Sequence, residues 1–316
     1  MREARPGVVE EDVGLVTEDD HSLRGTWYSP ASGVAPDRAV LLNSGAGIAC
    51  RHYRHLARFL AGAGIAVLTY DYRGVGVSSP PSLANFDATI EDWSEFDCTA
   101  ATRWLATRCP RARLTGIGHS FGSLLFGGSR AASLVADYVM IGPHTGYPGD
   151  YRMVYRIPMA VVWHLAMPAI TRMFGYFPAS RLRLGDDLPK GVALQWGHQR
   201  RTPAEHLQAG DRLGRLIGDC ARVTGRALLI VFSDDGFGTA AGAARVRDYF
   251  PGLAFEQWLI RPADVGLARI GHFGFFKQTA ADRLWPRLLA HLGGPSTTDG
   301  GHVPAVGSVA ARPGMA

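Results

Sequence analysis

One pentapeptide combines a nucleophilic side chain with the small neighbours that such a side chain needs. Gly118-His119-Ser120-Phe121-Gly122 matches the pattern G-x-S-x-G. An apolar strand pattern precedes it, and small and apolar residues that predict a helix over 123–134 follow it. A sharp strand–turn–helix connection lifts a serine hydroxyl clear of the sheet, and the flanking glycines avoid collisions with neighbouring elements. The setting favours Ser120 as a nucleophile over Ser120 as an ordinary helix N-cap.

A serine hydroxyl is a poor nucleophile until a base removes its proton, so the chemistry requires a histidine. Of the eleven histidines, His272 is the best placed, because it follows the last predicted strand and precedes the last predicted helix. A loop at the carboxyl end of the strands is where a base reaches the serine. His119 adjoins the serine, so its ring is expected to point away and to pack structurally. His144 and His164 are expected to line the pocket.

The base needs an acid that fixes its tautomer and stabilises the imidazolium ion. Asp234 and Asp235 both follow the apolar run 226–232, at the carboxyl end of a predicted strand. From position alone, either aspartate can orient the histidine while the other caps the next helix. With either of them, the order along the chain is serine, aspartate, histidine, which is the order of the α/β-hydrolase arrangement.

Acyl transfer also needs donors for the negative oxygen of the tetrahedral intermediate. The N–H of Phe121, directly after the serine, is one expected donor. The loop 43–47 follows the predicted strand 39–43, and its small residues allow a close approach of the backbone. We choose Ala46 as the second donor, although a tight strand-to-helix turn is the simpler explanation of this loop.

The elements that must position these residues alternate along the chain. Apolar runs predict strands, first an antiparallel pair and then a mostly parallel set, over 12–17, 22–28, 39–43, 65–71, 113–118, 136–142, 226–232 and 254–260. The later runs are continuous rather than alternating, as expected of strands that are buried on both faces. Helical patterns lie between them, over 51–64 and 90–108. The sequence therefore predicts an α/β fold with a mostly parallel, doubly wound sheet.

One region interrupts this alternation and divides the chain. Residues 143–211 hold seven prolines spaced along the segment, together with many aromatic residues and methionines. This composition predicts an inserted helical cap that shapes a pocket for an organic substrate. The core is then formed by 1–142 and 212–292, and the Gly/Pro/Ser/Ala-rich end, 293–316, is predicted to be a disordered tail.

Composition limits the partners. The formal net charge is +5, but no basic stripe interleaved with aromatics accompanies it, which argues against nucleic acid. The four cysteines form no CxxC pair and no metal-binding spacing with histidine, so we expect no metal or other cofactor. The N-terminus lacks the apolar core of a secretory signal, and the apolar stretch 159–170 is too short for an integral membrane segment. We expect a cytoplasmic protein; its oligomeric state is not predicted.

Several strings resemble the α/β-hydrolase superfamily over residues 10–292. They are SGAG (44–47), DYRGVGVSS (71–79), GHSFG (118–122), FGYFP (174–178), DDGFGT (234–239) and IGHFGFF (270–276). More narrowly, the chain looks like the bacterial predicted α/β-hydrolase group with a serine-aminopeptidase or monoacylglycerol-lipase-like core. The resemblance implies the α/β-hydrolase fold and places the acid at Asp235. Thr239 stands where proline is usual, and Ser44 stands where many relatives have the histidine of an HG loop.

These residues predict a serine hydrolase that cleaves an ester, thioester or related acyl bond of a hydrophobic small molecule. Ser120, His272 and Asp235 form the expected catalytic set, and the intermediate is an acyl-enzyme. Acyl transfer or cyclisation in biosynthesis is an alternative, because the same triad serves both reactions. A non-catalytic ligand-binding protein is the alternative of another class, and the intact set argues against it.

Overall fold

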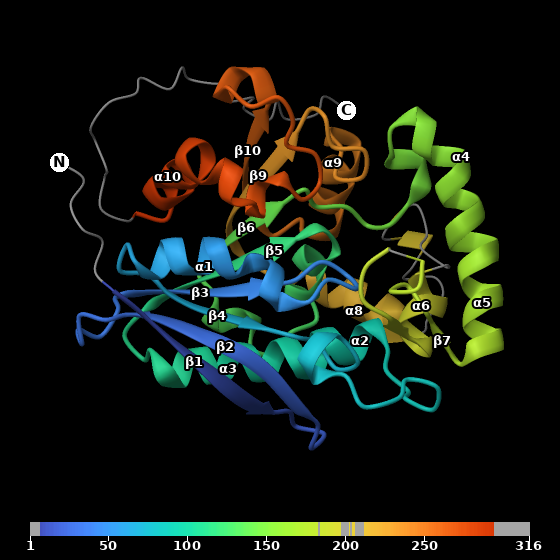
Figure 1. The fold of residues 1–316 in the computed structure, drawn as a ribbon, viewed down its shortest axis with the longest axis horizontal. Helices are drawn as coiled ribbons and strands as arrows, with labels where there is room; N and C mark the ends of the chain where they lie inside the picture. The colour runs from blue at the N-terminus through green and yellow to red at the C-terminus, as the bar shows by residue number, and fades with distance from the viewer. Residues whose placement is uncertain (1–6, 183, 197–201, 203, 206–211, 294–316) are drawn as a thin grey trace.

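A computed structural model describes residues 7–293 apart from 183, 197–201, 203 and 206–211 (Figure 1). Within them, an eight-stranded sheet has the order β1-β2-β4-β3-β5-β6-β9-β10. The strands are β1 (Val8–Val16), β2 (Ser22–Pro30), β3 (Arg38–Asn43), β4 (Ala66–Tyr70), β5 (Arg113–His119), β6 (Asp137–Ile141), β9 (Gly225–Phe232) and β10 (Leu253–Ile260). β2 pairs antiparallel with β1 and β4, and the other neighbours pair parallel. The predicted strands and fold class are confirmed, with bounds shifted by a few residues.

The central strands are apolar throughout because helices cover both faces of the sheet. Along β3, Leu41 packs into one hydrophobic cluster, whereas Val40 and Leu42 pack into the other. Helices α1 (Arg54–Ala61) and α10 (Ala281–His291) cover the second cluster, and α3 (Thr99–Arg108), α8 (Arg212–Cys220) and α9 (Ala240–Tyr249) cover the first. Figure 1 shows α1 and α10 on one side of the sheet and α3 on the other. This arrangement holds the carboxyl ends of the parallel strands at one edge.

The helical pattern over 90–108 is confirmed as one continuous helical stretch. It consists of α2 (Ile90–Asp92), the wider π-helical turns of η3 (Trp93–Cys98) and then α3. Thr89 begins it with a capping box, in which its hydroxyl accepts from the Asp92 N–H while the Asp92 carboxylate accepts from the Thr89 N–H.

The single helix predicted over 123–134 is wrong. Two short 3-10 helices, η4 (Ser120–Phe126) and η5 (Ala132–Leu134), stand in its place, separated at Gly127 and Gly128. Helix α8 packs directly against these glycines, and a Cβ at Gly127 would lie only 2.0 Å from Cys220 Sγ. Tertiary packing against α8 therefore determines the backbone here, and the local apolar pattern does not reveal it.

Between β6 and α8 the described chain contains mostly helices. One continuous helix of 22 residues, Met153–Phe174, is formed by α4 (Met153–Val161), η7 (Val162–Ala166) and α5 (Met167–Phe174). The small strands β7 (Tyr176–Phe177) and β8 (Leu188–Pro189) and the helix α6 (Lys190–Trp196) follow. Figure 1 shows α4 and α5 along one side of the molecule, beyond the carboxyl ends of the strands.

The apolar stretch expected over 159–170 lies inside this longer helix. By length and composition alone the helix Met153–Phe174 is able to cross a membrane, and only a small part of it is buried. Its α5 half packs against α6 and β7 and buries Met167, Pro168 and Thr171. The predicted tail lies outside the described residues except for Gly293.

A buried ion pair joins the loop after β4 to the helical stretch η3, and we expect its loss to destabilise the fold. The Arg73 guanidinium donates to Asp97 Oδ1 at 2.7 Å and also pairs with Asp19, while the Arg73 backbone N–H donates to Asp97 Oδ2. Asp97→Ala leaves a buried cation with only its half-exposed partner, which should lower the unfolding free energy by about 3 kcal/mol. Urea denaturation measures this, with exposed Asp12→Ala as the control; equal stability of the two variants would contradict the assignment.

Candidate active site

The backbone at Ser120 has the strain expected of a serine held on a sharp turn. Its backbone φ angle is +55°, a conformation that residues other than glycine rarely adopt. The turn is tight on both sides: a Cβ at Gly118 would lie 2.4 Å from the Ser123 Cα, and one at Gly122 would lie 2.1 Å from the Ser44 carbonyl oxygen. Only glycine fits these two positions, so the turn brings β5, η4 and the loop after β3 into contact.

The structure brings the three side chains predicted for the triad together in one hydrogen-bonded chain. Ser120 Oγ lies 3.0 Å from His272 Nε2, and His272 Nδ1 lies 2.7 Å from Asp235 Oδ2. Ser120 begins η4 directly after β5, Asp235 follows β9, and His272 lies between β10 and α10. The carboxylate accepts from Nδ1–H, which leaves Nε2 free to accept the serine proton. This is the geometry that general-base activation of a serine requires.

The two neighbouring aspartates have different partners. Asp235 contacts the ring of His272, and its second oxygen, Oδ1, accepts from the N–H groups of Phe237 and Gly238. Burial raises the pKa of Asp235, but the bond from His272, its charge and the two backbone donors together hold that pKa below its usual value. Asp234 instead accepts from the backbone N–H groups of Ile270 and Gly271 and so fixes the loop that carries His272.

His119 points away from the serine hydroxyl and connects two loops of the site through hydrogen bonds. The Gly45 N–H donates to Tyr53 Oη at 2.8 Å, and the Tyr53 hydroxyl donates to His119 Nδ1 at 2.8 Å. His119 Nε2–H then donates to the His272 carbonyl oxygen at 3.0 Å. Burial and the neighbouring His272 lower the pKa of His119 well below its usual value, so this ring is neutral. The chain of bonds ties the loop after β3 to the loop of the proposed base.

A second histidine, His144, also contacts the serine. The sequence predicts this residue only as part of the pocket wall. His144 Nε2 lies 2.8 Å from Ser120 Oγ, and the ring is almost completely buried. Burial, followed by the charge of His272, lowers the pKa of His144 to about 3. His144 follows β6, the strand next to β5, and a position after the neighbouring parallel strand is the sequence signal that could have indicated this contact.

The two predicted oxyanion donors lie in neighbouring segments, the first turn of η4 and the loop after β3. Phe121 lies in the first turn of η4, where N–H groups have no partner within the helix. In the loop after β3, the Gly45 N–H donates to the Tyr53 hydroxyl oxygen. Within the described part of the chain, the Ala46 N–H has no hydrogen-bond acceptor. The contact between Gly122 and the Ser44 carbonyl oxygen brings the two loops together.

Buried neutral histidines make the fold sensitive to acid. The pKa values of His119 and His144 are lowered in the folded state, whereas an unfolded histidine titrates near pH 6.5. Below that pH the unfolded state binds protons that the folded state does not, so stability falls as pH falls. Each ring should contribute about 1 kcal/mol per pH unit between pH 6 and pH 4. Urea unfolding over this range measures the slope of unfolding free energy against pH. His144→Gln should reduce that slope by the amount that corresponds to about one bound proton. An unchanged slope would contradict this.

Aromatic rings from the segment after β6 pack against residues next to the triad. Trp196 contacts Phe121 with a ring-centroid distance of 4.8 Å, and Trp163 contacts Trp196. Tyr151 packs against Phe237, which in turn lies 5.7 Å from the ring of His272. The surroundings of Ser120 are therefore largely apolar, and the serine itself is only 6% exposed.

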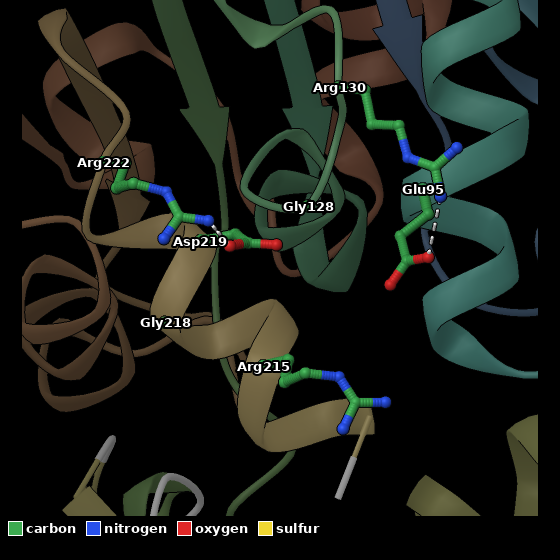
Figure 2. A pocket seen from close by; sticks show the side chains of 7 residues that line it. All are labelled: Glu95, Gly128, Arg130, Arg215, Gly218, Asp219 and Arg222. Carbon is green, nitrogen blue, oxygen red and sulfur yellow. Dashed lines mark hydrogen bonds and ion pairs between the residues drawn. The ribbon is translucent and has the colours of Figure 1, made fainter.

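A surface pocket lies elsewhere on the molecule, and none of the triad residues lines it. Figure 2 shows its lining residues, which are Glu95, Gly128, Arg130, Arg215, Gly218, Asp219 and Arg222. Arg130 pairs with Glu95 at 3.5 Å, and Arg222 pairs with Asp219. None of these seven residues bonds to Ser120, His272 or Asp235. Among the residues that the structure describes, no cluster of His, Cys, Asp and Glu has the composition of a metal site, and all four cysteines are buried without a disulfide.

Comparisons with known proteins agree with this fold. The family model of the serine aminopeptidases, family S33, matches residues 34–176, which include the G-x-S-x-G turn. The fold is similar to that of an esterase from Pyrococcus furiosus, with 18% identity over 90% of this chain and 91% of that one and a TM-score of 0.58. The fold is therefore that of the α/β-hydrolase superfamily. The resemblance predicted from its motifs is confirmed.

Two further α/β-hydrolase folds are similar over most of their length. A hyperthermophilic esterase from Pyrobaculum calidifontis shares 17% identity over 91% of this chain and 86% of that one, with a TM-score of 0.55. The α/β-hydrolase GrgF from a Penicillium species shares 19% identity over 90% and 98%, also with a TM-score of 0.55. No curated protein matches the sequence. The predicted enzyme class, a serine hydrolase of the α/β-hydrolase superfamily, is confirmed at this level.

Proposed function

We propose that this α/β-hydrolase cleaves an ester or thioester of a hydrophobic small molecule through an acyl-enzyme on Ser120. The observation that carries the proposal is the unbroken hydrogen-bonded chain from Ser120 Oγ through His272 to Asp235, at a serine held in a strained conformation. Strain at a buried polar residue persists only where the surrounding structure holds it, and such positions concentrate at functional sites.

The reaction follows from the proton positions. As Ser120 Oγ attacks the acyl carbon, its proton moves to His272 Nε2, and the Phe121 and Ala46 N–H groups hold the negative oxygen. The tetrahedral intermediate collapses when His272 returns the proton to the leaving alcohol or thiol. A water molecule, deprotonated by His272, then releases the acyl group as a carboxylic acid. Each step uses groups of this chain and no cofactor.

The apolar side of the site supports a hydrophobic acyl or aromatic group. Tyr151, Trp163 and Trp196 all come from the segment 143–211. Tyr151 and Trp196 pack against His144, which contacts the serine, and Trp163 packs against Trp196. We assign this segment as the cap over the two-part core 1–142 and 212–292. Apolar walls with a few convergent polar groups are the usual composition of a small-molecule site.

Chain-length dependence tests this proposal. We expect turnover of p-nitrophenyl esters that increases from acetate toward medium-length acyl chains, since each buried methylene group contributes about 0.8 kcal/mol. L-alanine p-nitroanilide serves as the aminopeptidase substrate and should react far more slowly. Folded protein that hydrolyses no ester in the panel, or that prefers the anilide, would overturn the proposal.

A further inference from the structure

Two histidines contact the same serine oxygen, and only one of them can act as its base. His272 Nε2 lies 3.0 Å and His144 Nε2 lies 2.8 Å from Ser120 Oγ. A neutral imidazole has one donor and one acceptor nitrogen, so the partner of the other ring nitrogen determines the role of each Nε2. For His272 that partner is the Asp235 carboxylate, which accepts from Nδ1–H.

The partner of His144 Nδ1 is a hydrogen-bond donor, whereas the partner of His272 Nδ1 is an acceptor. The backbone N–H of Gly146 donates to His144 Nδ1 at 3.0 Å, so this nitrogen has a lone pair and no proton. The proton of the neutral ring is therefore on Nε2, which faces the serine. A nitrogen that already has a proton cannot remove one from Ser120, so His144 donates to Oγ while His272 accepts from it.

The packing holds His144 in this orientation. Its ring lies among Tyr151, Trp196 and His272, with centroid distances of 5.6, 6.1 and 5.5 Å. Gly142 and Gly146 on either side have positive φ values of 55° and 85°, which only glycine adopts freely. On the other side α9 approaches closely, since a Cβ at Gly242 would lie 3.2 Å from the His144 Cβ. The imidazole has little freedom to turn away from the serine.

We propose that His144 is a second catalytic histidine, a fixed hydrogen-bond donor to Ser120 Oγ that completes a directed chain His144→Ser120→His272→Asp235. This inference rests on the proposed function. By donating to one lone pair of Oγ, His144 turns the serine proton toward His272. No proton leaves His144 in either half-reaction.

The donor acts most strongly when Oγ has negative charge. That charge develops when Ser120 loses its proton during acylation, and again when the acyl–Oγ bond breaks during deacylation and His272 returns the proton to Oγ. A hydrogen bond to a charged acceptor is about twice as strong as one between neutral groups. The His144 bond is therefore stronger in the transition states than in the resting enzyme, which is the condition for a catalytic contribution.

Matched substitutions separate this donor role from packing. Glutamine in place of histidine puts an amide N–H near the position of Nε2, whereas leucine fills similar space without a donor. We expect His144→Leu to lower kcat/KM for p-nitrophenyl acetate about 10²- to 10³-fold, mainly through kcat. His144→Gln should stay within about tenfold of the wild type. The exposed His52→Gln is the control and should not change the rate.

Two further readouts make the test independent of a folding effect. Second-order labelling by a fluorophosphonate requires the same attack by Oγ, so its rate should fall in parallel in His144→Leu protein with an unchanged thermal melting curve. Nitrogen-15 NMR of labelled histidine should show His144 protonated at Nε2 and not at Nδ1.

Three results would overturn the inference. They are a folded His144→Leu variant with wild-type rates, a folded His144→Gln variant as slow as His144→Leu, and a His144 ring protonated at Nδ1. If the wild type neither labels nor hydrolyses esters, the proposed function fails, and the NMR tautomer alone then decides whether the donor exists.

Discussion

Ser120→Ala should lower kcat/KM on p-nitrophenyl esters by about 10⁴- to 10⁶-fold, the largest effect we expect from any single substitution. The loss is large because no other group can form the acyl-enzyme, while the proposed oxyanion donors at Phe121 and Ala46 and the apolar surroundings remain and leave a small residual rate. Alanine removes only the hydroxyl group at this position with φ of +55° and adds no bulk, so the fold should be retained. Steady-state rates on the preferred ester measure the effect.

The control for this prediction is a serine close to the site that the mechanism does not use. Ser123 lies one turn further along η4, where its hydroxyl donates to the Gly118 carbonyl oxygen at 3.0 Å. Ser123→Ala should change the rate by less than about tenfold, because the hydroxyl contacts no reacting atom. A Ser120→Ala protein with more than a few per cent of the wild-type activity would contradict the assignment of the nucleophile.

Asp235→Asn should cost about 10⁴-fold in kcat, the second largest effect. An amide group can donate to His272 Nδ1, which then favours the tautomer with the proton on Nε2. That tautomer cannot accept the serine proton, although the geometry of the site is unchanged. The measurement is kcat at neutral pH, where the lowered pKa of Asp235 keeps the wild-type carboxylate ionised.

Asp234→Asn is the matched control, one residue away on the same loop. The amide oxygen of asparagine can still accept from the Ile270 and Gly271 N–H groups, so the loop that carries His272 should stay in place. Its kcat should remain within about tenfold of the wild type. Equal losses in the two variants would contradict Asp235 as the specific partner of His272.

Much of the candidate site could be predicted because it depends on a simple property of parallel sheets. Ser120, Asp235 and His272 follow three apolar runs, and parallel strands end at the same edge of their sheet. Strand patterns and glycine positions therefore indicated that Ser120 meets two residues more than one hundred positions further along the chain. Position alone left Asp234 and Asp235 equivalent, and the family resemblance favoured the residue that the structure places against His272.

The parts that could not be predicted depend on packing between distant segments. The helix expected over 123–134 is broken because α8, nearly one hundred residues later, packs against Gly127 and Gly128. The contact of His144 with the serine depends on the turn after β6 and on the rings around it. The Gly127-Gly128 pair is a local turn signal that the helix prediction did not use, whereas the His144 contact follows only from how close two elements approach in the folded chain.

Covalent labelling tests the central claim, that Ser120 is an activated nucleophile, most directly. The folded wild-type protein should react with a fluorophosphonate to give one adduct per chain by intact mass, and peptide mapping should place that adduct on Ser120. Ser120→Ala protein, with the same thermal melting curve, should give none. A wild-type protein that stays unlabelled, or an adduct that persists in Ser120→Ala, would contradict the account.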